Sequence, residues 1–343
     1  MADLVAGVDG GNSKTDLVLA DTDGRLLAWV RGDGTRPHRE GMALTAERLA
    51  GLMHRALDEA GRPDASVAVG AYFLANVDVP EAEEVALRQL SGLKVAARVV
   101  VRNDTLAILR AGAPEGWGVA VVSGAGINAV GVHPHGRSAR FLSLGDITGD
   151  WGGGMGVARA GLGAAVRAGD GRGQATVLRD VLPVRFGLPT VEAVALAVSG
   201  GEIPVAELHG LAPLVFAAAD GGDTVAQEIV VRLGDEIVTM VTALLRRLGL
   251  LDTATPVVLG GGTLQNGQVL LHEHIRERLA GLAPLARLRV LDVQPVAGAV
   301  AEALMEAGAT EPARYRVHQA IAGRRPPSMH GAPPARSANE TRS

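Results

Sequence analysis

Short apolar runs separated by tight turns dominate the start of the chain. Such runs cover residues 4–8, 17–20 and 26–30, and the dipeptide Asp23-Gly24 separates the last two. Two runs joined by a glycine-containing turn are typical of a β-hairpin. The pattern therefore predicts that the chain begins with three consecutive strands.

Helical and strand patterns alternate after residue 40. Apolar residues three and four apart predict a helix over 45–60. The same reasoning predicts strands at 67–72 and 98–101, and helices over 80–90 and from 105 to 110. This alternation favours an α/β fold.

The opening pattern then returns later in the chain. A strand over 119–122 ends at a glycine-rich turn, and two further strands follow at 130–132 and 139–142. Ser123 stands 114 residues after Asp9 in the equivalent turn. A duplication of this period predicts two domains of related topology. The second half also predicts a glycine-dense loop over 149–156, a strand over 256–259, and helices over 157–168, 190–198, 223–248 and 296–307.

Composition narrows the class of protein. Hydrophobic residues make up 47% of the 343 residues and aromatic residues only 3%, so the core must be aliphatic. The net charge of −4 argues against a nucleic-acid surface. The absence of cysteine excludes disulfides and thiolate metal sites. No apolar run is long enough to span a bilayer and the start lacks a secretory signal, so we expect a cytoplasmic protein without membrane contact.

Three glycine turns follow predicted strands. In the first, residues 9–15, glycines would let main-chain amides approach phosphate oxygens, although an ordinary hairpin turn fits as well. A P-loop is excluded there because no helix follows. The second, residues 124–129, matches a dinucleotide fingerprint, but a strand follows it instead of the required helix. The third glycine turn, residues 260–263, also follows a predicted strand. Taken together, the three turns indicate a nucleotide held between two domains.

Four aspartates lie beside these turns and loops. Asp104 follows an apolar strand where a helix begins, so it is either a helix N-cap or a general base at a strand end. Asp146 and Asp150 lie in the loop that contains Gly149, either as solvated carboxylates or as ligands. Asp9 could orient a hydrated Mg²⁺. The nine histidines form no metal motif.

Five motifs in one order carry a family resemblance. They are VDGGNSKT at 8–15, NDT at 103–105, SGAGIN at 123–128, GD at 149–150 and GGGT at 260–263. Together they resemble the BadF/BadG/BcrA/BcrD-type ATPase family, in particular its N-acetylglucosamine kinase branch, over about residues 4–307. The resemblance implies the actin-like, sugar kinase and Hsp70 superfold. In that α/β fold, two duplicated RNase-H-like domains enclose a nucleotide cleft.

The resemblance also implies domain limits. We expect an N-terminal domain over 1–114 and a C-terminal domain over 115–310, whose final helix returns to the N-terminal domain. Residues 311–343, rich in Arg, Pro, Ser and Ala, are expected to be a disordered tail.

The resemblance also assigns roles to individual residues, motif position by motif position. Asp104 matches the catalytic aspartate of the amino-sugar kinases, and Asp9 matches the carboxylate that positions Mg²⁺ through water. Asn128 and Asp150 match residues that bind sugar hydroxyls. The resemblance implies ATP contacts from Gly10, Gly11, Asn12, Ser13, Lys14, Thr15, Ser123, Gly124, Ala125, Gly126, Gly261, Gly262 and Thr263.

The chain departs from the family pattern in its sugar loops. Trp151 replaces a glutamate after Asp150, and it either stacks on a sugar ring or packs in the core. Arg36 and His38 occupy a loop that usually offers an asparagine, so they could meet a different sugar substituent. Leu144-Gly145 replaces a Trp-Gly pair. The further substrate-binding candidates are therefore Gly145, Asp146, Arg36, His38 and Trp151.

The sequence thus predicts an ATP- and Mg²⁺-dependent kinase that phosphorylates the primary hydroxyl of an amino sugar. The alternatives are a non-catalytic sugar or nucleotide sensor on the same scaffold, and a kinase for another hexose or a cyclitol. The other branch of the family activates 2-hydroxyacyl-CoA dehydratases through a cysteine-bound iron–sulfur cluster, and a chain without cysteine excludes it. The expected partner is a small-molecule amino sugar, and a homodimer is left open.

Overall fold

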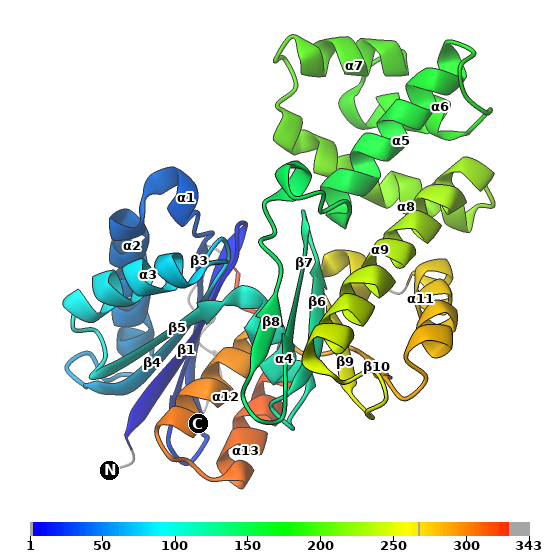
Figure 1. Ribbon diagram of the computed structural model, residues 1–343. Helices are drawn as coiled ribbons and strands as arrows, with labels where there is room; N and C mark the ends of the chain where they lie inside the picture. Colours follow the sequence, from blue (N-terminus) through cyan, green and yellow to red (C-terminus); the bar gives the residue numbers. More distant parts are fainter. Residues whose placement is uncertain (1–2, 267, 329–343) are drawn as a thin grey trace, which may run out of the picture. The chain divides into compact units, whose positions relative to one another are not determined.

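The computed structural model describes residues 3–266 and 268–328, which fold into two compact units (Figure 1). The first unit contains residues 3–104 and 293–328, so the chain leaves it and later returns. The second unit is Thr105–Asp292. The change of unit therefore falls at residue 104, ten residues before the expected domain limit, and the return falls at residue 293.

A five-stranded mixed sheet forms the centre of the first unit. Its strands are β1 (Leu4–Gly10), β2 (Lys14–Asp21), β3 (Leu26–Asp33), β4 (Val67–Leu74) and β5 (Arg98–Asn103). Their order is β3-β2-β1-β4-β5, with β1–β2 and β2–β3 antiparallel and β1–β4 and β4–β5 parallel. Strands β1, β3, β4 and β5 consequently end at the same edge of the sheet.

The first unit also contains helices. They are α1 (Pro37–Glu40), α2 (Met42–Glu59), α3 (Pro80–Gly92), α12 (Val296–Glu306) and α13 (Glu311–Ala322). The apolar side of α2 packs with every second residue of β1, Leu4, Ala6 and Val8, in one core cluster. Helix α12 packs against β1 and β4, which joins the returning chain to the first unit.

The second unit repeats the same sheet. Its strands are β6 (Gly118–Ser123), β7 (Ile127–Val132), β8 (Ser138–Arg140), β9 (Pro256–Gly260) and β10 (Arg287–Val290). The order β8-β7-β6-β9-β10 and the strand directions match those of β3-β2-β1-β4-β5. The predicted α/β fold with a duplicated topology is thus confirmed.

The second unit carries more helices than the first. They are α4 (Asp104–Gly112), α5 (Gly153–Gly169), α6 (Leu178–Val181), α7 (Val191–Ser199), α8 (Ala212–Asp220), α9 (Thr224–Leu248), α10 (Gly262–Gln265) and α11 (Val269–Leu282), with 3₁₀ turns at Gly145–Ile147, Pro183–Phe186 and Val205–Leu211. Helix α9 is the longest and packs against β6, β7, α8 and α11. The Asp223 carboxylate caps its N-terminus by accepting the Ala226 N–H at 2.9 Å.

Two sequence predictions need correction. Residues 311–322 form α13 instead of a disordered tail, because Thr310 caps the helix and its buried residues Ala313, Val317 and Ile321 share one side. Residues 329–343 of the predicted tail lie outside the described residues. The glycine-dense loop ends at residue 152 instead of 156, because α5 begins at Gly153.

Among the described residues, no single helix is both long and apolar enough to cross a membrane. One bent pair, Leu178–Phe186 with Val191–Ser199, meets the length and composition criteria when its two helices are taken together.

Candidate active site

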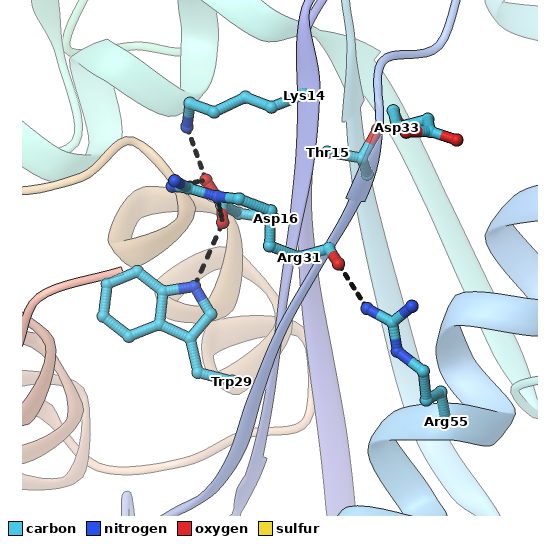
Figure 2. Close-up of polar contacts among 7 residues, drawn as sticks. All are labelled: Lys14, Thr15, Asp16, Trp29, Arg31, Asp33 and Arg55. Carbon is cyan, nitrogen blue, oxygen red and sulfur yellow. Dashed lines mark hydrogen bonds and ion pairs between the residues drawn. The ribbon is translucent and has the colours of Figure 1, made fainter. Parts of the chain in front are cut away.

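A row of charged side chains crosses three strands of the first unit near the first glycine turn. The strand register places Asp9 of β1 opposite Asp16 of β2, and Asp16 opposite Arg31 of β3. Lys14 and Trp29 lie two residues away on β2 and β3, so their side chains are on the same face of the sheet. Figure 2 shows the Lys14, Trp29 and Arg31 side chains converging on Asp16.

Asp16 is the most enclosed member of this row. Arg31 donates to both carboxylate oxygens at 2.8 Å, Lys14 Nζ donates to Oδ2 at 2.5 Å, and Trp29 Nε1 donates to Oδ1 at 3.3 Å. Burial alone would raise the pKa of Asp16, but the hydrogen bonds from Arg31 and Lys14 hold that pKa below its usual value. Asp16 is therefore a buried carboxylate that stays ionised.

Asp9 has the opposite balance. Asp9 is a buried residue, only 9% exposed. Burial raises the pKa of the Asp9 carboxyl to about 6, although the Lys14 charge partly opposes this shift. The neighbouring Asp16 charge adds to the rise. A cation that binds beside Asp9 would relieve this cost.

The first glycine turn is closed by main-chain bonds. The Gly11 N–H donates to the Lys14 carbonyl at 2.9 Å, and the Thr35 N–H donates to the Gly11 carbonyl at 2.9 Å. The buried Thr35 Oγ1 lies beside Gly10 and has no hydrogen-bond partner in the part of the chain that the structure describes. Ser13 is exposed at the tip of the turn. Thr15 donates its hydroxyl to the Asp33 carbonyl at 2.8 Å, so its side chain is used inside the sheet.

Asn12 is held from two sides. Its carbonyl accepts Arg36 Nε at 2.9 Å, and its side-chain oxygen accepts Asn76 Nδ2 at 2.8 Å. Arg36 and His38 are both exposed at α1, as members of the loop that the sequence singled out. Asn76, which follows β4 with a left-handed φ of 62°, was missed by the sequence analysis.

Asp104 lies at the same sheet edge as this turn. It is the first residue of α4 and directly follows Asn103, the last residue of β5. Asn103 Nδ2 donates to Asp78 Oδ1 at 2.8 Å, which ties the end of β5 to the segment after β4. Strand β5 is two places from β1 in the sheet, a separation of about 10 Å. Asp78 was also missed, although the rule that ligands gather at the carboxyl ends of strands would have found both Asn76 and Asp78.

The second and third glycine turns meet in the second unit. Ser123 ends β6, and its fully buried hydroxyl has no hydrogen-bond partner within residues 3–266 and 268–328. A Cβ at Gly261, where φ is +91°, would lie 2.5 Å from the Ser123 carbonyl oxygen. Only glycine can therefore hold the third turn against the second. Gly262 and Thr263 open α10, and the Thr263 hydroxyl lies 3.5 Å from the Gly124 carbonyl.

The second turn also rests on the start of α5. The Gly154 N–H donates to the Gly124 carbonyl at 2.7 Å, and the Met155 N–H donates to the Ala125 carbonyl at 2.9 Å. A Cβ at Gly153 would lie 2.4 Å from the Gly126 carbonyl oxygen. These contacts explain why α5 begins earlier than its apolar pattern predicts.

The proposed sugar ligands of the second unit are held by the loop between β8 and α5. Ser143 donates its hydroxyl to Asn128 Oδ1 at 2.5 Å. The Thr148 hydroxyl accepts the Leu144 N–H at 2.9 Å and donates to an Asp150 carboxylate oxygen. The same loop thus orients both Asn128 and Asp150, which the structure places in one region.

The other candidates of this loop have protein partners. Arg232 of α9 lies 3.9 Å over the Trp151 ring, and α5 packs nearby at Gly156. One ring face of Trp151 is therefore covered by a guanidinium group. Asp146 forms a 2.8 Å ion pair with Arg159, and its side chain is largely exposed. Gly145 opens the short 3₁₀ turn Gly145–Ile147, which contains Asp146. Across residues 3–266 and 268–328, no three His, Asp or Glu residues are grouped so that they could hold a metal ion.

Comparison with known proteins relates this geometry to sugar kinases. The chain is 25% identical over 269 residues to the N-acetylmuramic acid/N-acetylglucosamine kinase of Clostridium acetobutylicum, covering 78% of this chain and 88% of that protein. It is 24% identical over 313 residues to the N-acetyl-D-glucosamine kinase of Dictyostelium discoideum, covering 88% and 98%. A solved structure of a candidate N-acetylglucosamine kinase from Chromobacterium violaceum matches with a TM-score of 0.67, 25% identity, and coverage of 87% and 98%.

The fold also matches a ROK hexokinase from Thermus thermophilus, with a TM-score of 0.55, 20% identity, and coverage of 89% of this chain and 99% of that one. The model of the BadF/BadG/BcrA/BcrD ATPase family matches residues 6–303, which include all three glycine turns and both duplicated sheets except the first two residues of β1. The chain that carries these turns on an actin-like fold is a member of the BadF/BadG/BcrA/BcrD ATPase family.

Proposed function

We propose that the protein is an ATP-dependent kinase that phosphorylates the primary hydroxyl of an amino sugar, such as N-acetylglucosamine or glucosamine. The observation that carries the proposal is the placement of Asp104 at the sheet edge where the Asp9–Lys14 turn lies. This edge offers a general base and a phosphate-binding turn in one unit. Similarity to N-acetylglucosamine kinases supports the choice of acceptor.

In this proposal Asp104 accepts the proton of the sugar's primary hydroxyl as its oxygen attacks the γ-phosphorus. The bond from that phosphorus to the ADP oxygen breaks, and ADP leaves. Phosphoryl transfer depends mainly on positioning and charge stabilisation. Asn128 and Asp150 would bind sugar hydroxyls, and their contacts with Ser143 and Thr148 would keep them oriented.

The glycine turns of each unit, taken separately, offer groups suited to nucleotide phosphates or their metal. Ser123 in the second unit and Thr35 in the first each bury a hydroxyl that has no hydrogen-bond partner among the described residues, and a bound ligand could satisfy such groups. The Asp9 carboxylate is an oxygen ligand of the type that Mg²⁺ prefers. Bound Mg²⁺ would neutralise phosphate charge, and Asp9 would position it through water.

A coupled assay of ADP release with Asp104→Asn tests the assignment of the base. Loss of a general base lowers turnover by about 10²- to 10⁴-fold, while nucleotide affinity should stay within about twofold. Asp223→Asn is the matched control, because Asp223 also lies at a helix start but caps α9. Asparagine caps helices as well as aspartate does, so both variants should fold.

Full turnover by Asp104→Asn would reject Asp104 as the base. Sugar binding by calorimetry without sugar-stimulated ADP release in the native protein would instead favour a sensor on the same scaffold.

A further inference from the structure

The contacts of Asp16 exceed what a structural ion pair needs. The Asp16 side chain is 0% exposed, and Arg31 alone offers it two parallel hydrogen bonds of 2.8 Å. That bidentate pair already balances the carboxylate charge. Lys14 is a second cation on the same carboxylate, at 2.5 Å.

Lys14 is the member of this group that reaches solvent. Its side chain is 36% exposed, compared with 15% for Arg31. Lys14 is also the first residue of β2, and its carbonyl closes the glycine turn by accepting the Gly11 N–H at 2.9 Å. An ammonium group carries three N–H donors, and its contact with Asp16 uses one of them. Because Asp9 lies opposite Asp16 in the strand register, the Lys14 ammonium on Asp16 shares the face of the sheet that carries Asp9, at the start of the first glycine turn.

We propose that Asp16 is a positioning residue for nucleotide binding: it holds the Lys14 ammonium on the face of the sheet that carries Asp9, at the start of the first glycine turn, ready to contact an anionic phosphate group. The proposal rests on the proposed function for the identity of the anion, a nucleotide phosphate. Arg31 compensates the negative charge of Asp16. The positive charge of Lys14 is therefore available to Asp9 and to a bound anion.

The cost of losing Asp16 follows from the freedom of a lysine side chain. Without the carboxylate, the Lys14 and Arg31 cations would repel each other and Lys14 would turn toward solvent. Ordering one such side chain on binding then costs nucleotide affinity by roughly three- to tenfold. A purely structural Asp16 would lower stability and leave the affinity of the folded protein unchanged.

A double-mutant cycle separates these two roles. The variants are Asp16→Asn, Lys14→Met and the double variant, with the Kd for MgADP measured by calorimetry and the KM values for ATP and sugar measured by coupled assay. Arg55→Met is the matched control for Lys14→Met, since it removes a positive charge that donates to the main-chain carbonyl of Arg31 on β3 instead of to Asp16 (Figure 2).

We expect Asp16→Asn and Lys14→Met each to weaken MgADP binding about three- to tenfold, with the sugar KM changed less than twofold. The double variant should bind no more weakly than Lys14→Met, because Asp16 acts through Lys14. Arg55→Met should bind MgADP normally. Unchanged affinity in folded Asp16→Asn, or effects of the two substitutions that multiply, would overturn the proposal.

Two further results keep the test decisive. If Asp16→Asn does not fold, Lys14→Met alone decides, because unchanged MgADP affinity in that variant refutes the proposal. If the native protein binds MgADP with this coupling but no sugar stimulates ADP release, the kinase assignment fails and the role of Asp16 stands. A native protein that does not bind MgADP would refute both.

Discussion

The raised pKa of Asp9 predicts that this residue destabilises the folded protein at neutral pH. Its pKa rises from 3.8 to about 6 because the carboxyl is buried. A shift of this size corresponds to about 3 kcal/mol, at about 1.4 kcal/mol for each pKa unit. We therefore expect Asp9→Asn to stabilise the metal-free protein by up to about 3 kcal/mol at pH 8.

The sign of the pH dependence follows from the direction of the shift. The folded protein holds the Asp9 proton more tightly than the unfolded chain does, so this group favours folding below pH 4. The contribution is lost as the pH rises from about 4 through about 6. The gain from Asp9→Asn should consequently be near zero at pH 4 and largest above pH 7.

Urea denaturation in the presence of a metal chelator measures this effect at pH 4, 6 and 8. The native protein and Asp9→Asn should show equal slopes, so that the change in midpoint reports stability. The same variant should lose MgADP affinity, since Asp9 would no longer help to orient Mg²⁺. A stability difference that is the same at pH 4 and pH 8 would refute the explanation by burial of charge.

Three other substitutions test separate features. Gly261→Ala should destabilise by more than about 2 kcal/mol and weaken nucleotide binding, because its Cβ would meet the Ser123 main chain; native-like unfolding of this variant would contradict that. Arg232→Met should cost about 0.5–1 kcal/mol through loss of its contact with Trp151, and an equal cost in a Trp151→Leu background would show no coupling. Asp223→Ala should cost about 1–2 kcal/mol in thermal unfolding with turnover unchanged, and a loss of turnover would assign Asp223 to the site.

Local patterns in the sequence predict most of the fold. The first three strands, the repeat of their turns and the long α9 follow from hydrophobic spacing and glycine turns alone. The patterns did not predict strand β10, because its sequence, Arg-Leu-Arg-Val, is short and carries two arginines at a half-exposed sheet edge. Helix α13 was not predicted because only Ala313, Val317 and Ile321 mark its buried side, although Thr310 is a residue type that favours a helix N-cap.

The sequence indicated candidate site residues where a polar side chain lies at the end of a predicted strand. Asp9 and Asp104 were proposed in this way, and Asn76 and Asp78 follow β4 at the same sheet edge. Asp16 could not be found from local pattern, because its contacts with Arg31 depend on the register between β2 and β3. The contact of Trp151 with Arg232 joins residues 81 positions apart, so the sequence left open whether Trp151 binds sugar or packs.

The role of Asp104 distinguishes a catalyst from a binding protein on this fold. The central claim, that the protein phosphorylates an amino sugar, depends on identifying the substrate. The direct measurement is MgATP-dependent ADP release with N-acetylglucosamine, glucosamine, N-acetylmuramic acid and glucose, with the product identified by phosphorus NMR. The proposed kinase predicts release stimulated most by an amino sugar, with phosphate on its primary hydroxyl. Equal ADP release with and without every sugar, or phosphate on another hydroxyl, would contradict it.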